Sequence, residues 1–65
     1  MRIELNGKPT ETGAGTLAEL ILEQGFDPAS VATALDGEFV ARGQRATAAL
    51  RSGVRVEVLA PMQGG

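Results

Sequence analysis

Apolar and polar residues alternate at the start of the chain, with the period of a half-buried β-strand. Ile3 and Leu5 supply the apolar positions, and the pair Asn6-Gly7 follows directly as a strong two-residue hairpin signal. We therefore predict a first hairpin whose return strand runs from Lys8 to about Thr12. Pro9 lies in that return strand and has no backbone N–H, so the strand is expected at an edge of the sheet.

The spacing of apolar residues then changes to that of a helix. Thr16-Leu-Ala-Glu19 has the form of a capping box, in which the Thr hydroxyl and the Glu carboxylate satisfy N–H groups of the first turn. The predicted helix begins there, runs for about nine residues and ends at Gly25, which can adopt a left-handed conformation. One face of this helix should pack on a sheet, and its members are Leu17, Leu20, Ile21 and Gln24.

Further strands follow the helix. Residues 31–35 and 38–40 flank Asp36-Gly37, which predicts a second hairpin. Residues 44–50 are rich in alanine and could form a turn of helix. The clearest strand covers residues 54–59, where valine alternates with charged residues, so one face should be buried and the other exposed.

This order of elements is typical of a β-grasp fold. It fits an α+β domain in which a mixed sheet of about four to five strands has one main helix packed on one face. By analogy with that fold, the first and last strands are expected to pair in parallel at the centre of the sheet. A chain of 65 residues allows one such domain. We predict that it covers residues 1–59 and that residues 60–65 form a flexible tail.

The composition removes most catalytic chemistries. There is no Cys and no His, which excludes thiol nucleophiles, disulfides, zinc sites built on thiolate or imidazole, and His-based triads. No metal site is expected. Eight acidic and six basic residues give a net charge of -2, which argues against nucleic acid or anionic lipid as a partner. No apolar run has the length of a signal or a membrane span, so the predicted location is the cytoplasm.

The last residues of the chain differ in kind from the rest. Pro61 cannot extend the hydrogen-bond ladder, so the segment from Ala60 to Gly65 should project from the sheet. Fully extended, it spans roughly 20 Å at about 3.3 Å per residue, enough to thread into another protein's active site. Gly64 and Gly65 lack Cβ atoms and can enter a narrow channel. The sequence therefore indicates a carrier whose reactive group is the Gly65 carboxylate, against the alternative of a frayed terminus.

A set of short motifs runs along nearly the whole chain. They are Leu5-Asn-Gly-Lys8, Thr16-Leu-Ala-Glu-Leu20, Phe26-Asp-Pro28, Val31-Ala32, Asp36-Gly-Glu-Phe-Val40, Arg42, Gln44, Gly53, Arg55-Val-Glu-Val58 and Gln63-Gly-Gly65. Together they resemble the ThiS family, the sulfur carrier proteins of thiamine biosynthesis. The chain departs from the family pattern at Asp36, where Asn is common, at Arg45, where an aromatic residue is common, and at Pro61-Met62, in a tail that varies.

The resemblance implies a ubiquitin-like protein that is not an enzyme but a co-substrate of enzymes. A separate E1-like adenylyltransferase would adenylate the Gly65 carboxylate with ATP and Mg²⁺. A sulfur donor such as a cysteine desulfurase would then convert it to a thiocarboxylate, which would deliver sulfur to thiazole synthase. ATP, Mg²⁺ and the donor thiols belong to these partners, so this chain is expected to bind no cofactor and to be a monomer when free.

Docking on these partners is expected to use the outer face of the last strand and the tail. Leu59 is the first candidate, because it is in phase with Arg55 and Glu57 and should face away from the core. Arg55 and Glu57 on the same face of the strand, and Met62 and Gln63 in the tail, are further docking candidates.

Three other functions fit the same sequence. The first is the related small carrier of molybdopterin synthesis, which uses the same thiocarboxylate. The second is a ubiquitin-like modifier joined through Gly65 to a lysine of a target protein, and the third is a binding module whose tail has no chemical role. The short chain, the hairpin motif at residues 36–40 and the ending Gln63-Gly-Gly65 favour the thiamine assignment.

Overall fold

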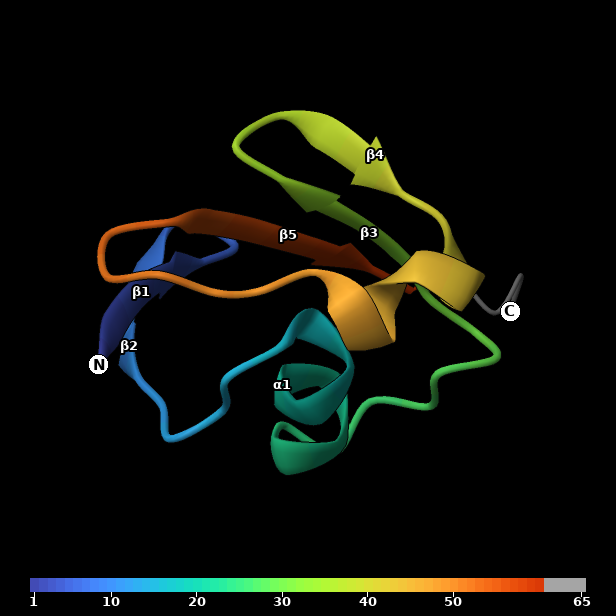
Figure 1. The fold of residues 1–65 in the computed structure, drawn as a ribbon, viewed down its shortest axis with the longest axis horizontal. Helices are drawn as coiled ribbons and strands as arrows, with labels where there is room; N and C mark the ends of the chain where they lie inside the picture. The colour runs from blue at the N-terminus through green and yellow to red at the C-terminus, as the bar shows by residue number, and fades with distance from the viewer. Residues whose placement is uncertain (61–65) are drawn as a thin grey trace.

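The alternating segments near the two ends of the chain form neighbouring strands at the centre of one sheet. The computed structural model describes residues 1–60, and the strand order in its sheet is β2-β1-β5-β3-β4 (Figure 1). The first and last strands pair in parallel, as expected, whereas the other neighbouring pairs are antiparallel. The strands are β1 (Arg2–Leu5), β2 (Lys8–Glu11), β3 (Ala32–Leu35), β4 (Glu38–Val40) and β5 (Arg55–Leu59).

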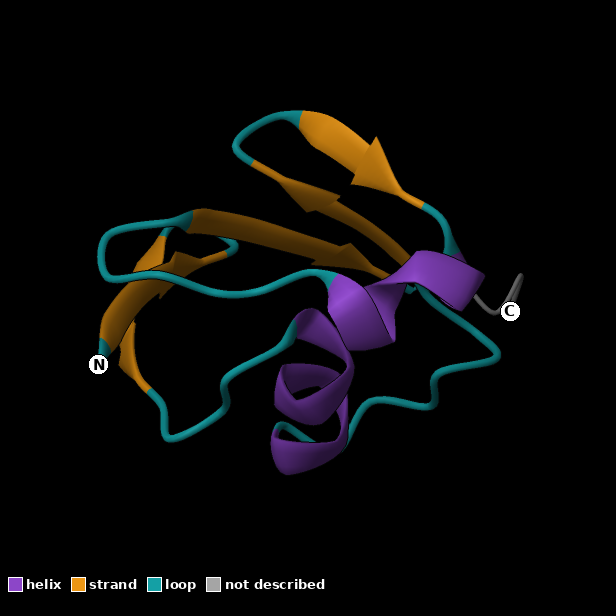
Figure 2. Ribbon diagram, in the orientation of Figure 1, coloured by secondary structure: helices purple, strands orange, loops and turns teal. Residues whose placement is uncertain are grey.

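Helical structure in residues 1–60 lies on one side of this sheet. The α-helix α1 (Leu17–Glu23) crosses beneath the strands, and the 3₁₀ helix η1 (Arg42–Thr47) lies beside it (Figure 2). The predicted α+β class and the β-grasp arrangement, with five strands and one main helix, are confirmed. The opposite face of the sheet is left uncovered by any helix of the described chain.

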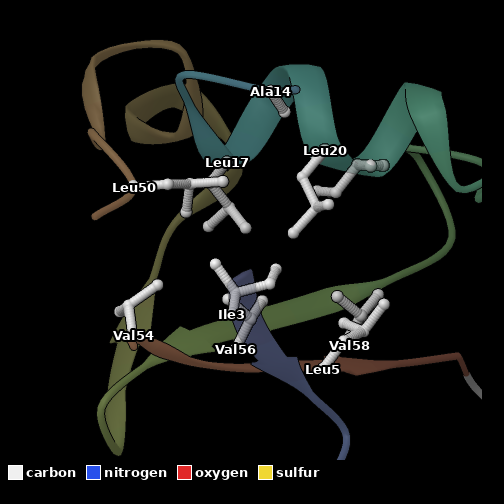
Figure 3. Packing of buried hydrophobic residues seen from close by; sticks show 10 residues of the cluster. Ile3, Leu5, Ala14, Leu17, Leu20, Leu50, Val54, Val56 and Val58 are labelled. Atoms are coloured by element: carbon white, nitrogen blue, oxygen red, sulfur yellow. The ribbon is translucent and has the colours of Figure 1, made fainter. Parts of the chain in front are cut away.

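The two central strands and the helix meet in a single core. Ile3 of β1 and Val56 of β5 are 1% and 0% exposed, and they point toward Leu17 and Leu20 of α1 (Figure 3). Burying each of these aliphatic side chains stabilises the fold by about 1.5–3 kcal/mol, because it removes apolar surface from water. Since alternate strand residues fill the core, the residues between them remain on the uncovered face.

Both predicted hairpin turns have the left-handed backbone that two-residue turns need. The φ angles are +50° and +82° in Asn6-Gly7 and +48° and +85° in Asp36-Gly37. Asp36 also accepts a hydrogen bond of 3.0 Å from the N–H of Arg55 and pairs with Arg51 at 2.9 Å. Its carboxylate therefore serves the local structure of the turn.

The helix begins and ends where its sequence predicts. Thr16 Oγ1 accepts from the N–H of Glu19 at 3.2 Å, and the Glu19 carboxylate accepts from the N–H of Thr16 at 3.1 Å, so the capping box is confirmed. Gly25, with φ +80°, ends the helix as predicted, in a Schellman motif in which the N–H of Phe26 donates to the carbonyl of Ile21. The expected nine residues correspond to the helix with its two caps, Thr16 and Gln24, included. The helix has seven residues, and Gln24 is its exposed C-cap rather than part of the apolar face.

Other boundaries differ from the expected ones by a few residues. The return strand β2 stops before Thr12, because Thr12 turns inward and its hydroxyl donates to the Glu23 carboxylate. The strand β3 begins one residue later than expected, after a loop that turns at Asp27. The helical turn predicted at residues 44–50 forms earlier, as η1, so the alanine-rich segment only partly coincides with it.

Candidate functional site

The exposed face of β5 carries the docking residues that the sequence predicted within residues 1–60. Arg55, Glu57 and Leu59 lie on the face opposite α1, because Val56 and Val58 between them are buried in the core. Leu59 is 64% exposed, as its phase predicts. It is also the last residue of the strand, directly before the tail. Its place at the end of β5 makes Leu59 a candidate contact for a partner that binds the C-terminal residues.

Apolar side chains of two neighbouring strands surround Leu59. The pairing of β3 with β5 places Ala32 opposite Leu59 and Ala34 opposite Glu57, and β4 then places Phe39 opposite Ala34. Phe39 is 73% exposed. Its ring and Leu59 border a hollow of about 240 Å³ in this face. We call the set Ala32, Ala34, Phe39 and Leu59 the outer patch.

Phe39 and the two alanines of the outer patch are missing from the predicted docking residues. A strand of three residues shows no period of its own, so its exposed face cannot be read from alternation. The signal that could have found Phe39 is the hairpin turn. Counting pairs outward from the two-residue turn Asp36-Gly37 places residue 39 opposite residue 34, so both belong to the face of Leu59.

A charged surface lies on the other side of Leu59. It surrounds a second hollow that is lined by Glu4, Asn6, Gly7, Arg55, Glu57 and Leu59. Glu4 of β1 lies beside Arg55 in the parallel pair, so opposite charges are neighbours there. Glu57 and Leu59 line both hollows, so a partner docked over these two residues would contact the apolar and the charged surface.

The loop before β3 forms a wall beside the start of the tail. Residues 29–32 line a hollow together with Leu59 and Ala60. Asp27 shapes this loop, because its carboxylate accepts hydrogen bonds from the N–H of Ala29 at 3.0 Å and from the hydroxyl of Ser30 at 2.8 Å. These hydrogen bonds, the one from Ala29 foremost, hold the pKa of Asp27 below its ordinary value, since they stabilise the charged form.

Arg45 holds the same loop from the inside. Its side chain is 4% exposed, and it donates from Nη1 to the carbonyl of Pro28 at 2.9 Å and from Nη2 to the carbonyl of Val31 at 2.7 Å. The position at which an aromatic residue is common in the ThiS family is here a buried anchor. Arg45 therefore belongs to the interior and not to the exposed face where partners could dock.

The reactive site predicted at the C-terminus lies outside the described residues, of which Ala60 is the last. This applies to Gly65 as the reactive residue, to Gly64, and to Met62 and Gln63 as docking candidates. From the predicted set, the structure places Arg55, Glu57 and Leu59 on one exposed face of β5, with Leu59 at the end of the strand.

Residues 1–60 contain neither a metal-binding cluster nor a membrane-spanning helix. In residues 1–60, no group of three or more Asp, Glu, His or Cys side chains is placed so that it could hold a metal ion. No helix in this part of the chain is long and apolar enough to cross a membrane.

Comparisons with known proteins agree with the fold and with the motifs. The sequence model of the ThiS family matches residues 2–65. A crystal structure of a thiamine biosynthesis protein (ThiS) from Geobacter metallireducens is 30% identical, with 100% of both chains covered and a TM-score of 0.80. An NMR structure of a thiamine biosynthesis protein from the same organism is 33% identical, with 100% of this chain and 88% of that chain covered and a TM-score of 0.81.

No curated protein matches the chain. The family match nevertheless extends from the second residue to the C-terminal Gly64-Gly65, and the similar structures share the arrangement of strands and helix over the full length of the chain. The protein therefore belongs to the ThiS family.

Proposed function

We propose that this protein is a sulfur carrier of thiamine biosynthesis whose reactive group is the Gly65 carboxylate. The observation that carries the proposal is the family match, which includes the terminal glycines and covers residues 2–65. It is supported by the thiamine biosynthesis proteins of similar structure. The absence of Cys and His from the sequence adds to it, because no side chain remains that commonly carries sulfur.

The proposed chemistry starts from a poor electrophile. An oxygen of the Gly65 carboxylate attacks the α-phosphorus of ATP in the active site of an E1-like adenylyltransferase, and pyrophosphate leaves. Mg²⁺, which is held with the ATP by that enzyme, neutralises charge on the phosphates. The acyl adenylate now has AMP as a good leaving group. The carrier contributes a carboxylate that can reach the reaction, and the enzyme contributes everything else.

The sulfur step needs a nucleophilic sulfur donor, and we propose a persulfide, whose second sulfur is afterwards reduced by a thiol. The terminal sulfur of a persulfide, formed for example by a cysteine desulfurase, attacks the acyl carbon and displaces AMP. A thiol of the partner then attacks the other sulfur of the acyl disulfide, so a disulfide forms on the partner and the thiocarboxylate is released. The thiocarboxylate is a nucleophile at neutral pH, and we propose that it delivers its sulfur to thiazole synthase.

The carrier's own residues provide docking in this scheme. The outer patch offers an aromatic and a leucine side chain that are 73% and 64% exposed, beside the charged surface that contains Arg55 and Glu57. Exposed aromatic side chains next to charges are common anchors of protein interfaces. We propose that the adenylyltransferase and thiazole synthase both bind here, with Met62 and Gln63 of the tail as further contacts. The protein is then a co-substrate and not an enzyme, and its cytoplasmic location and monomeric free state stay predictions.

The experiment that tests this function measures the intact mass of the protein after incubation with ATP, Mg²⁺, the adenylyltransferase of the same organism and a cysteine desulfurase with cysteine. Exchange of one oxygen for sulfur is expected. Because oxidation of a methionine changes the mass almost equally, the product must also react with a thiol-directed alkylating reagent. A chain that lacks Gly65 is the matched control, and the carrier function fails if the complete chain is converted no better than this control.

Two further observations distinguish the other functions. Growth of a host that requires thiazole, restored by this protein, separates thiamine synthesis from molybdopterin synthesis. Covalent adducts between Gly65 and lysines of other proteins would instead identify a protein modifier.

A further inference from the structure

The strand β5 continues farther than the strand beside it. In the parallel pair, Leu5 is level with Val56, and the chain of β1 then leaves the sheet through the turn at Asn6-Gly7. The N–H of Asn6 still donates to the carbonyl of Val56 at 2.9 Å. One step farther along β5, the N–H and the carbonyl of Val58 have no strand on that side.

The side chain of Asn6 takes the place of the missing strand. The N–H of Val58 donates to Asn6 Oδ1 at 2.9 Å, and Asn6 Nδ2 donates to the carbonyl of Val58 at 3.1 Å. The primary amide thus makes the pair of hydrogen bonds that a neighbouring backbone would make. Both contacts are partly buried, so their loss would leave two polar groups of a central strand without protein partners.

These two hydrogen bonds lie at the end of the strand from which the tail continues. Val58 is followed by Leu59 and Ala60, which we call the tail root. On the β3 side, Leu59 is fixed by its pairing with Ala32. On the β1 side, the contacts between Asn6 and Val58 are the last ones before the tail root in the described chain. The side-chain amide of Asn6 therefore holds the end of β5 at Val58, on the side where β1 has ended.

We propose that Asn6 is a positioning residue for the reaction of the terminal carboxylate, because it fixes the direction in which the tail root leaves the sheet relative to the outer patch. The inference rests on the proposed carrier function. The outer patch holds the domain on the partner, and the tail must enter the partner's active site from that docked position. When the tail root takes several directions instead of one, the terminal carboxylate spends less time in the productive position, and the rate of the reaction falls even when docking is intact.

Asparagine meets both requirements of this position. Its backbone has φ +50°, a conformation that Asn, Asp and Gly accept and most residues resist. Its side chain must accept from the Val58 N–H and also donate to the Val58 carbonyl. An ionised aspartate can accept but cannot donate, and glycine can do neither.

The test compares Asn6→Gly with Asp36→Gly. Both substitutions keep a left-handed turn, since φ is +50° and +48° at the two positions, and both remove a side chain that holds the backbone of β5. Asp36 holds Arg55, at the start of the strand, whereas Asn6 holds Val58, at its end. Asp36→Gly is therefore the control for a general loss of stability, and Asn6→Asp is a second variant that keeps the turn and the acceptor.

The first measurement is amide hydrogen exchange in the free protein. In Asn6→Gly, the N–H of Val58 should exchange about ten-fold faster or more, relative to the N–H of Glu4, which keeps its bond to the Val54 carbonyl in the same pair of strands. In Asp36→Gly, the ratio of the two rates should not change. An unchanged ratio in Asn6→Gly would overturn the proposal without reference to any reaction.

The second measurement is the rate of pyrophosphate release with the adenylyltransferase. For Asn6→Gly we expect kcat to fall about ten-fold or more. Because Asn6 also lines the charged hollow, kcat is compared at saturating carrier, where a change in KM does not contribute. The kcat of Asn6→Asp should lie between those of Asn6→Gly and the unchanged protein. The kcat of Asp36→Gly should equal that of the unchanged protein. Equal losses of kcat in the two glycine variants, or no loss in Asn6→Gly, would contradict the proposal. If the unchanged protein is not adenylated at all, the proposed function fails, and the exchange rates alone decide whether Asn6 holds the tail root.

Discussion

Arg45 donates a hydrogen bond from Nε to Thr33 Oγ1 over 3.0 Å, and both side chains are buried. The hydroxyl of Thr33 donates onward to the carbonyl of Val40 at 2.8 Å. The other guanidinium nitrogens reach the carbonyls of Pro28 and Val31. In residues 1–60, no carboxylate lies within ion-pair distance of this guanidinium. One buried cation, satisfied by oxygen atoms alone, thus connects η1 to both strands of the second hairpin and to the loop before them.

Replacing Arg45 with Met should therefore destabilise the domain strongly. Methionine can fill the space of the side-chain stem, but it leaves Thr33 Oγ1 and two carbonyl oxygens without their donor. We expect the free energy of unfolding to fall by about 2–3 kcal/mol, because unpaired buried polar groups cost about 1–3 kcal/mol each and the carbonyls are only partly buried. Urea denaturation measures this loss.

The control for that substitution is Arg42→Met, in the same 3₁₀ helix. Arg42 is exposed, so its replacement should change the free energy of unfolding by no more than about 0.5 kcal/mol. Equal losses in the two variants would show that the interior hydrogen bonds of Arg45 are not the cause.

The fold was largely predictable because its signals are local. Alternation at residues 2–5 and 54–59, two Asx-Gly turns and a capping box each depend on neighbours in the sequence, and the structure confirms them. The end of the helix at Gly25 was predicted as well, but the place of Gln24 was not. Gln24 fits the helical spacing, but the left-handed Gly25 ends the helix before that position can turn toward the core.

The site was predictable only where one strand defines it. Leu59 was found from its phase within β5, whereas the outer patch depends on the register of three strands, and a register is fixed by contacts between distant residues. The burial of Arg45 was even harder to predict from the sequence. Nothing near it in the sequence distinguishes a buried arginine from an exposed one, since its acceptors lie between residues 28 and 33.

The capping box of α1 gives a second prediction. Thr16→Ala removes the acceptor for the N–H of Glu19, and the free energy of unfolding should fall by about 1 kcal/mol. Thr16→Ser keeps the hydroxyl and should retain most of the stability. Urea denaturation of the two variants and of the unchanged protein makes the comparison, and a serine variant as weak as the alanine variant would point to lost packing of the threonine methyl group instead.

The carboxylate of Glu23 gives a third prediction, which concerns pH. The hydrogen bond from the Thr12 hydroxyl, followed by one from the N–H of Gly13, holds the pKa of Glu23 below its ordinary value of 4.5. A carboxylate with a lowered pKa in the folded state stabilises that state above the unfolded pKa, and this contribution is lost as the pH falls through the folded pKa.

Glu23→Gln should therefore be less stable than the unchanged protein at neutral pH, and the difference should shrink as the pH falls below 4.5. Thermal unfolding at a series of pH values measures it. Thr12→Ser, which keeps the hydroxyl, is the control and should keep the pH dependence of the unchanged protein. A difference between Glu23→Gln and the unchanged protein that stays constant down to acidic pH would show that the hydrogen bonds do not favour the charged carboxylate.

The fourth prediction concerns the outer patch. Phe39→Ser and Leu59→Ser should each raise KM for the carrier in the adenylation reaction by about ten-fold, because apolar anchors of an interface contribute roughly 1–2 kcal/mol each. Folding should change little, since these side chains are 73% and 64% exposed. Leu22→Ser is the matched control: Leu22 is 66% exposed but belongs to α1, on the other side of the molecule, so its KM should stay unchanged. Initial rates at varied carrier concentration separate the cases, and a rise in KM for the Leu22 variant as large as for the other two would remove the outer patch as the docking surface.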